Sequence, residues 1–235
     1  MIDLRPAASR FHTRIDWLDS WHSFSFGEHH DPANVGHGLL LASNDDVVAP
    51  ASGFGPHPHR DMEIVTWVLS GTLEHRDSEG NVGLLVPGLA QRMSAGTGIR
   101  HSEMNPDPGA PVRLVQMWVR PDTLGVPPGY EQVDVTDRLD AGGWVVVASG
   151  DPDVDSAIRI HQRSATMWVA RMAADERLEL PAAPFVHVFT ATGGLEVDGL
   201  GTDLGPGDAL RLSDEGPVGV RATQDGTELI VWGTA

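Results

Sequence analysis

Two short stretches carry residue pairs whose types and spacing are typical of metal ligands. "GPHPHRD" holds His57 and His59, and "IRHSEMN" holds His101 and Glu103, with one residue between the members of each pair. In a strand, side chains at i and i+2 point to the same face, about 6 to 7 Å apart. Two such pairs on facing strands of a small barrel would bring three imidazoles and one carboxylate to one point. The spacing therefore predicts a metal centre.

Two alternatives compete with this set of ligands. With 11 histidines in 235 positions, chance alone gives ~0.5 His-x-His pairs. The competing interpretation makes His57 and His59 plain loop residues and His101 a turn cap. Glu63 competes with Glu103 for the carboxylate position, but on a regular strand it lies about 13 Å along from His59. The spacing therefore favours Glu103.

The composition excludes several classes of site and partner. The formal charge is −17, from 16 basic and 33 acidic residues, so nucleic acid is not expected as a direct ligand. There are no cysteines, so a metal must be held by His, Asp or Glu. No run of about 18 apolar residues occurs and the first residues lack an apolar signal segment. We therefore expect a cytoplasmic protein without a membrane span.

Short strands joined by turns are expected along most of the chain. Gly 27 and Pro 17 are abundant, and β-branched runs alternate with turn sequences such as "SG" and "DSEGN". In the first half, strands are expected at residues 63–69, 72–76, 84–86 and 113–119. Pro58 cannot donate to a sheet ladder, so the two histidines beside it are expected at a strand start or on an edge strand.

Two β domains in tandem are the expected organisation. The Pro/Gly-rich stretch "RPDTLGVPPGYEQ", Arg120 to Gln132, is the predicted linker, and we divide the chain into residues 1–125 and 126–235. A second series of strands, which weakly repeats the first, is expected from "WVVVAS", "TMWVARM", "FVHVFTATGGLEVDG", "LGPGDALRL" and "TELIVWG". Nine of the 11 histidines precede the linker, so any metal site is expected in the first domain.

Three longer stretches resemble the pirin family of the cupin superfamily, specifically its short bacterial members with quercetin 2,3-dioxygenase activity. They are "WLDSWHSFSFGEHHDP", "GFGPHPHRDMEIVTWVLSGTLEHRDSEGN" and "MSAGTGIRHSEMNP", and the resemblance covers nearly the whole chain. It implies an all-β bicupin fold of two tandem antiparallel β-barrel (jelly-roll) domains, of which only the N-terminal one binds a metal. The family's ligand motif falls on His57, His59, His101 and Glu103. One departure is Gly88-Leu89, a turn position where many relatives have Gly-Asp.

The same resemblance implies a metal-dependent dioxygenase that cleaves quercetin, or a related flavonol or aromatic enol, with O2. Three imidazoles and one carboxylate suit Fe(II), which we expect, and also Zn, Cu or Ni. Glu103 is expected to act twice, as a ligand and as the acceptor of the substrate proton. The alternative is a non-catalytic, redox-sensing metal protein that binds a partner protein. A zinc-dependent cupin isomerase or hydrolase is a weaker third interpretation.

Two further polar residues lie in predicted strands near these motifs. His75, in "TLEHRDS", is expected to be a hydrogen-bonded histidine of the core. The alternative is that it supports the metal ligands from behind. Gln116, in "RLVQMWV", fits a pocket residue and a satisfied polar residue at a barrel end equally well.

Overall fold

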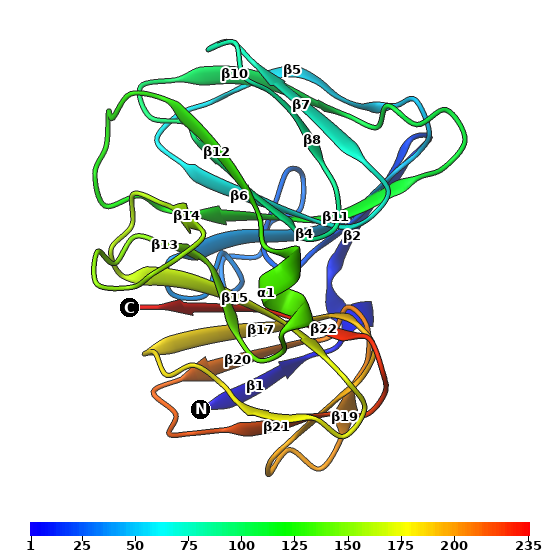
Figure 1. Ribbon diagram of the computed structural model, residues 1–235, viewed down its shortest axis with the longest axis vertical. Helices are drawn as coiled ribbons and strands as arrows, with labels where there is room; N and C mark the ends of the chain where they lie inside the picture. The colour runs from blue at the N-terminus through cyan, green and yellow to red at the C-terminus, as the bar shows by residue number, and fades with distance from the viewer.

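The computed structural model describes residues 1–235 and consists of four β-sheets, two of seven strands and two of four. The sheets are stacked as layers, with the two large sheets facing each other in the middle and one small sheet outside each of them (Figure 1). The helical segments are η1 (Ala7–Ser9) and α1 (Thr136–Asp140). The all-β prediction is therefore confirmed.

The first unit comprises the two upper sheets of Figure 1. Its large sheet contains, in spatial order, β12 (Gly129–Asp134), β9 (Leu89–Ser94), β6 (Glu63–Ser70), β11 (Val112–Val119), β4 (Leu40–Val48), β3 (Leu18–His22) and β2 (Phe11–Ile15). Its small sheet contains β5 (Gly53–His59), β10 (Ile99–Met104), β7 (Leu73–Asp77) and β8 (Val82–Leu85). β5 is an edge strand, as Pro58 predicts.

The second unit comprises the two lower sheets. Its large sheet contains β1 (Ile2–Arg5), β20 (Ala209–Ser213), β17 (Phe185–Thr192), β22 (Thr227–Thr234), β15 (Ala165–Met172), β13 (Val145–Ser149) and β14 (Ile158–Arg159). Its small sheet contains β16 (Arg177–Glu179), β21 (Gly219–Ala222), β18 (Leu195–Val197) and β19 (Asp203–Leu204).

Strand β6 shows why the two large sheets pack together. Its sequence, EIVTWVLS, is apolar on both faces, the pattern of a strand buried on both sides. Val65 and Trp67 belong to a cluster of 23 buried residues that also contains Trp232 of the second unit. The Trp67 indole N–H donates to Glu228 at 2.7 Å across the same interface. The two units therefore share this hydrophobic cluster.

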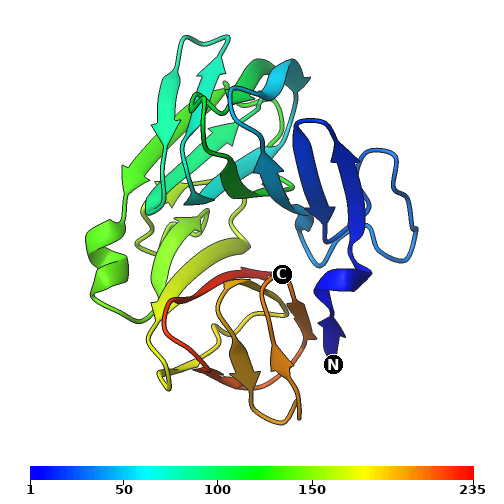
Figure 2. The same cartoon turned by 90° about the vertical axis from the view of Figure 1, so that its right-hand side faces the viewer.

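Strand pairing crosses the expected domain boundary in both directions. β1 pairs with β20, and Figure 2 shows this blue N-terminal strand beside the second unit. β12 lies after residue 125 yet pairs with β9 of the first unit. The linker predicted from Arg120 to Gln132 is therefore wrong from Gly129 onward, because these residues cover an otherwise open sheet edge. The division of the chain at residue 125 stays a prediction.

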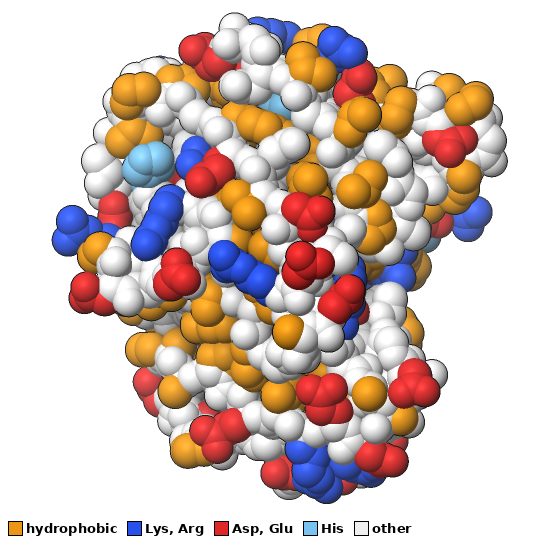
Figure 3. Space-filling view, viewed as in Figure 1, with side chains coloured by type: hydrophobic (Ala, Val, Ile, Leu, Met, Phe, Trp, Pro, Cys, Tyr) orange, Lys and Arg blue, Asp and Glu red, His pale blue; other side chains and the backbone are white.

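The expected strands are present. Those at residues 63–69, 72–76, 84–86 and 113–119 are confirmed as β6, β7, β8 and β11, with ends that differ by one or two residues. The five segments of the second half correspond to β13, β15, β17 with β18, β20 and β22. No helix of the chain is long and apolar enough to cross a membrane. On the face drawn in Figure 3, acidic and basic side chains are interspersed with apolar ones.

Candidate metal centre

Three neighbouring strands of the first unit's small sheet each carry two ionisable side chains at i and i+2. The pairs are His57 and His59 on β5, His101 and Glu103 on β10, and His75 and Asp77 on β7. In the register, His101 lies opposite His57 on one side and Asp77 on the other. The two predicted pairs therefore lie on adjacent, hydrogen-bonded strands of one sheet. The expectation that they lie on facing strands of a barrel is wrong, because β5 and β10 are neighbours.

The three predicted histidines come together. Their ring centroids are 4.4 Å apart for His57 and His101, 4.8 Å for His57 and His59, and 4.9 Å for His59 and His101. One nitrogen from each ring lies within 4.8 Å of the others. Metal–nitrogen bonds of about 2.1 Å place the ligands of one ion within about 4 Å of each other. The rings are therefore close to a ligating arrangement.

Each of these rings keeps its Nε2 free. A backbone carbonyl can only accept, so His57 Nδ1–H donates to the Gly55 oxygen at 2.9 Å, and its Nε2 is left as a lone pair. The Nε2 atoms of His59 and His101 are buried and have no hydrogen-bond partner. Buried polar atoms of this kind call for an explanation such as an ion. The three rings therefore fit a divalent metal ion.

A chain of hydrogen bonds sets the tautomer of His101. Asp77 accepts from His75 Nε2–H at 3.1 Å, which leaves His75 Nδ1 as an acceptor. His101 Nδ1 lies 3.4 Å from that atom and must then carry the proton that it donates. As a result, His101 presents a bare Nε2, the form that binds metals.

Asp77 is suited to this role because it is charged and fixed in place. Its carboxylate also accepts from the Asn81 side chain, at 2.9 and 3.2 Å, and from the Asn81 backbone N–H. Burial alone would raise its pKa, but the hydrogen bonds from Asn81 and His75 outweigh burial and hold the pKa of Asp77 below its usual value. The ring of Tyr130 stacks on His75, with the two ring centroids 4.7 Å apart.

Glu103 is buried and held by its neighbours on the large sheet. Gln116 Nε2 donates to its two oxygens, at 3.0 and 2.8 Å, and Thr66 Oγ1 donates at 3.5 Å. The Trp118 indole N–H donates to Gln116 Oε1 at 3.1 Å and so fixes the direction of the amide. Burial raises the pKa of Glu103, although the Gln116 hydrogen bonds oppose this shift.

The four predicted residues fall into two overlapping clusters that share His101. One contains His57, His59 and His101, and the other contains His75, His101 and Glu103. His75 has both ring nitrogens engaged, with Asp77 and with His101, so it lacks a free lone pair for an ion. Glu103 is then the carboxylate next to His101, the histidine that the two clusters share.

Burial, and then local charge, keeps His59 and His101 neutral in the absence of an ion. Burial, and then the neighbouring His57, lower the pKa of His59 to about 4. Burial, and then the surrounding histidines, lower the pKa of His101 to about 2. Neutral imidazole is the form that ligates metals, so both rings are ready to bind at neutral pH.

The competing carboxylate lies elsewhere. Glu63 accepts from Ser94 Oγ at 2.8 Å and lies 3.3 Å from His161 Nδ1 of the second unit, and it belongs to neither cluster. His75 is hydrogen-bonded and buried as expected, but it also contacts His101. The sequence reasoning missed Asp77, although its i+2 spacing from His75 repeats the pattern of the other two pairs.

The two units match two family models. The model described as Pirin matches residues 4–119. The model described as a quercetinase C-terminal cupin domain matches residues 146–232. These matches agree with the expected fold of two tandem cupin domains.

Individual relatives cover nearly the whole chain. It is 52% identical over 231 residues to the "Putative quercetin 2,3-dioxygenase" of Mycobacterium tuberculosis. The alignment covers 98% of this chain and 94% of that protein. It is 39% identical over 232 residues to the quercetin 2,3-dioxygenase of Escherichia coli K12. That alignment covers 98% of this chain and 97% of the relative.

Solved structures give the same result. The crystal structure of YhhW from Escherichia coli superposes with a TM-score of 0.90 at 39% identity, covering 100% of this chain and 98% of that one. The structure of bacterial pirin YhhW in complex with nickel(II) has a TM-score of 0.89 at 38% identity, covering 99% and 98%. The expected bicupin fold is therefore confirmed.

Proposed function

The chain belongs to the pirin family, and from that premise we propose that it is a metal-dependent dioxygenase that acts on quercetin or a related aromatic enol. The observation that carries this proposal is the convergence of three imidazoles, each with a free Nε2, beside a carboxylate held by Gln116. The names of the relatives support the reaction class.

His57, His59, His101 and Glu103 are the residues that would hold the ion. Three imidazoles and one carboxylate suit Fe(II), which we propose, and also Zn, Cu or Ni. When bound, such an ion supplies Lewis acidity that favours the deprotonated enol, and coordination positions open to substrate and dioxygen.

The protein's own contribution is to orient the substrate and to accept its proton. Glu103 accepts a hydrogen bond from the side-chain amide of Gln116, and the Gln116 side chain also lines the adjoining cavity. A substrate hydroxyl that enters from the cavity therefore meets the Gln116 amide and then a carboxylate oxygen. Gln116 holds that carboxylate through both oxygens, so the acceptor is oriented before the substrate arrives.

The decisive experiment is oxygen uptake by the Fe(II)-reconstituted protein with quercetin. The wild type is expected to consume oxygen, whereas His59→Ala, which loses one imidazole, is expected to lose both metal and uptake. His30→Ala is the matched control, because His30 is an exposed loop histidine outside both clusters. Absence of uptake from wild-type protein that carries a full equivalent of iron would refute the proposal.

Glu103→Gln tests the second role of the carboxylate. This variant keeps the shape of the side chain and an oxygen ligand but cannot hold a substrate proton at neutral pH. We expect turnover to fall by about a hundredfold, within the usual range for a general base. Retention of metal and of full turnover by this variant would show that Glu103 is not the proton acceptor.

A metal-binding regulator that contacts a partner protein is the second candidate, and one surface feature favours it. β8 is an edge strand of the small sheet, and Val82 and Leu84 on it are 57% and 54% exposed. Exposed apolar residues on an open edge suit contact with another chain. Full metal loading without oxygen uptake is the outcome that favours this candidate.

A further inference from the structure

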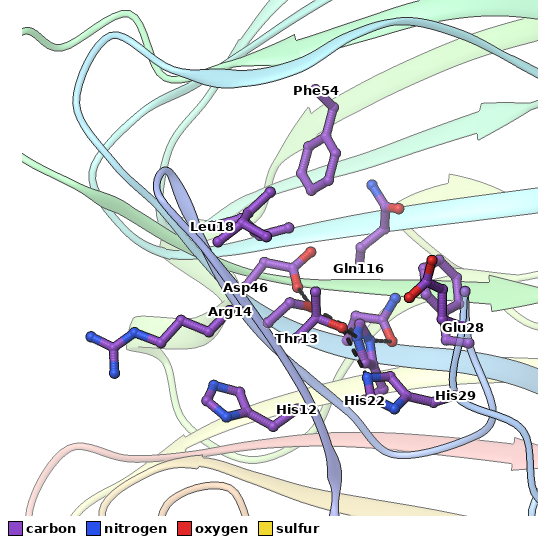
Figure 4. Close-up of a pocket in the computed structure, with 15 residues that line it drawn as sticks. His12, Thr13, Arg14, Leu18, His22, Glu28, His29, Asp46, Phe54 and Gln116 are labelled. Carbon is purple, nitrogen blue, oxygen red and sulfur yellow. Dashed lines mark hydrogen bonds between the residues drawn. The ribbon is translucent and has the colours of Figure 1, made fainter.

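A cavity of about 560 Å³ adjoins the candidate metal centre. It lies between the β2–β3 hairpin, the loop at residues 26–29 and the inner face of β4 and β11 (Figure 4). Leu18, Phe26 and Phe54 supply apolar walls, and Gln116 joins the cavity to Glu103. Its volume is within the range of small-molecule sites, about 300–1,000 Å³. None of the three ligand histidines lines it, so the cavity extends the site without containing the ion position.

The floor of the cavity is polar and its residues are aligned by the strand register. His22, Asn44 and Gln116 lie opposite one another on β3, β4 and β11. Ser20 and Asp46 form the next row. Since i and i+2 share a face, both rows point into the cavity. Buried polar side chains on the inner face of a sheet are costly for folding unless they are hydrogen-bonded, so each polar group of the floor needs a partner in the protein or in a ligand.

Most of these polar groups are already satisfied within the protein. His22 Nδ1 lies 3.0 Å from Asn44 Oδ1, and Thr13 Oγ1 lies 2.9 Å from His22 Nε2 and 3.0 Å from His29 Nε2. Asp46 is different: its Oδ1 accepts from Ser20, while its Oδ2 has no hydrogen-bond donor in the protein. Asp46 is 4% exposed and lines the cavity. The free acceptor of the floor is therefore Asp46 Oδ2.

The charges around Asp46 determine which ligand groups fit. Burial raises the pKa of Asp46 to about 7, and the charges of Asp45 and Glu103 add to this shift. Arg14 belongs to the lining, but its guanidinium points away from Asp46 (Figure 4). A carboxyl with no cationic partner, near a second carboxyl, disfavours an anionic ligand group. It favours a neutral hydrogen-bond donor such as a hydroxyl.

We propose that this cavity is the subsite for a hydroxylated aromatic ring of the substrate, and that Asp46 Oδ2 accepts a hydrogen bond from a hydroxyl on that ring. The ring packs among Leu18, Phe26 and Phe54, whose aromatic and aliphatic faces suit a flat apolar body. Asp46 and Gln116 are diagonal neighbours on adjacent strands, about 7 to 8 Å apart between backbone positions. One substrate therefore spans from the Glu103 end to Asp46. The inference rests on the proposed function, because it places the enol end of that substrate at Glu103.

The test is a binding measurement that needs no turnover. The protein is loaded with Zn(II), which has no redox chemistry, and titrated calorimetrically with two ligands. One is quercetin, and the other is the same flavonol without the two hydroxyls of its pendant ring. Both carry the same enol and carbonyl, so any difference in affinity comes from the pendant ring. At pH 8, where Asp46 is mostly ionised, we expect quercetin to bind wild-type protein at least about tenfold more tightly, the contribution of one hydrogen bond to a charged acceptor.

Asp46→Leu removes the acceptor at nearly constant volume. We expect the affinity ratio of the two ligands to fall to about one, while the ligand without pendant hydroxyls binds at least as well as before. Asp45→Asn is the matched control. Asp45 is the neighbouring buried carboxyl on β4, but it faces the other way and pairs with Arg113, at 2.9 and 3.0 Å. The affinity ratio should be unchanged in this variant.

Three outcomes would overturn the inference. The first is an equal affinity of wild-type protein for the two ligands, and the second is an equal loss of affinity for both ligands in Asp46→Leu. The third needs no variant, and so it decides the matter if Asp46→Leu does not fold. Nuclear Overhauser contacts between the pendant ring of quercetin and the rings of Phe26 and Phe54 are expected in the Zn(II) protein, and their absence places the ligand elsewhere. Because binding is read without oxygen, a failure of the dioxygenase proposal remains distinguishable from a failure of this one.

Discussion

Removal of the hydrogen-bond acceptor behind His101 should weaken metal binding without removing a ligand. The variant is His75→Leu, which leaves His101 Nδ1–H without the acceptor that now lies 3.4 Å away. The imidazole then loses both the restraint on its tautomer and the restraint on its orientation. Loss of such an outer partner typically costs 10- to 100-fold in metal affinity, or about 1.4 to 2.7 kcal/mol. The contact is long for a hydrogen bond, so we expect the lower end, about tenfold.

The assay is competitive titration with a chelator, using Zn(II) and Ni(II) at pH 7.5. His75→Asn is the rescue variant, because its Oδ1 can take the place of the His75 Nδ1 acceptor and should restore most of the affinity. Unchanged affinity in His75→Leu would refute the assignment of tautomers made from Asp77 and His101. A loss far beyond 100-fold, without rescue by His75→Asn, would show that His75 is itself a ligand, as the second cluster allows.

Three further predictions concern stability. The folded-state pKa of Asp46, about 7, lies above its unfolded value, so this group destabilises the protein progressively as pH rises from about 4 to 7. Asp46→Asn should therefore be more stable than wild type at pH 8, by on the order of 4 kcal/mol, and not at pH 4, as measured by urea unfolding. The folded-state pKa of His59, about 4, lies below its unfolded value, so the unfolded chain binds more protons below about pH 6.5. The stability of metal-free wild type relative to metal-free His59→Gln should accordingly fall between about pH 6.5 and 4, and a difference that does not change with pH in that window would contradict this. Trp67→Phe removes the 2.7 Å hydrogen bond to Glu228 between the units and should cost about 1 to 3 kcal/mol in the same unfolding assay.

Local spacing was sufficient to predict the strands and the faces on which the ligand candidates lie. The i, i+2 pairs at His57 and at His101 are properties of a few consecutive residues, and period-2 geometry converts them directly into a shared face. The same holds for the edge position of β5, which Pro58 imposes because it lacks a backbone donor. The absence of cysteine fixed the classes of metal ligand that remain.

Local spacing could not predict which strands pair with each other in the sheets. Nothing in "GYEQVD" indicates that it completes the first unit's sheet and not the second's, because an extended segment pairs with whichever open edge the folded chain brings near. For the same reason, β1 joins the C-terminal unit although it begins the chain. Strand register likewise depends on long-range burial, and it sets Asp77 and His75 opposite His101 and Glu103.

The sequence alone therefore determined an all-β chain whose first half offers three imidazoles and a carboxylate, because residue type and periodicity are local. Only the tertiary structure decided how those groups are used. It separated Glu63 from the histidines, set the tautomer of His101 through a strand that contains no predicted ligand, and built a cavity floor from β3, β4 and β11. Hydrogen-bond partners and cavities are relations between segments far apart in the chain, and they exist only once the sheets have packed.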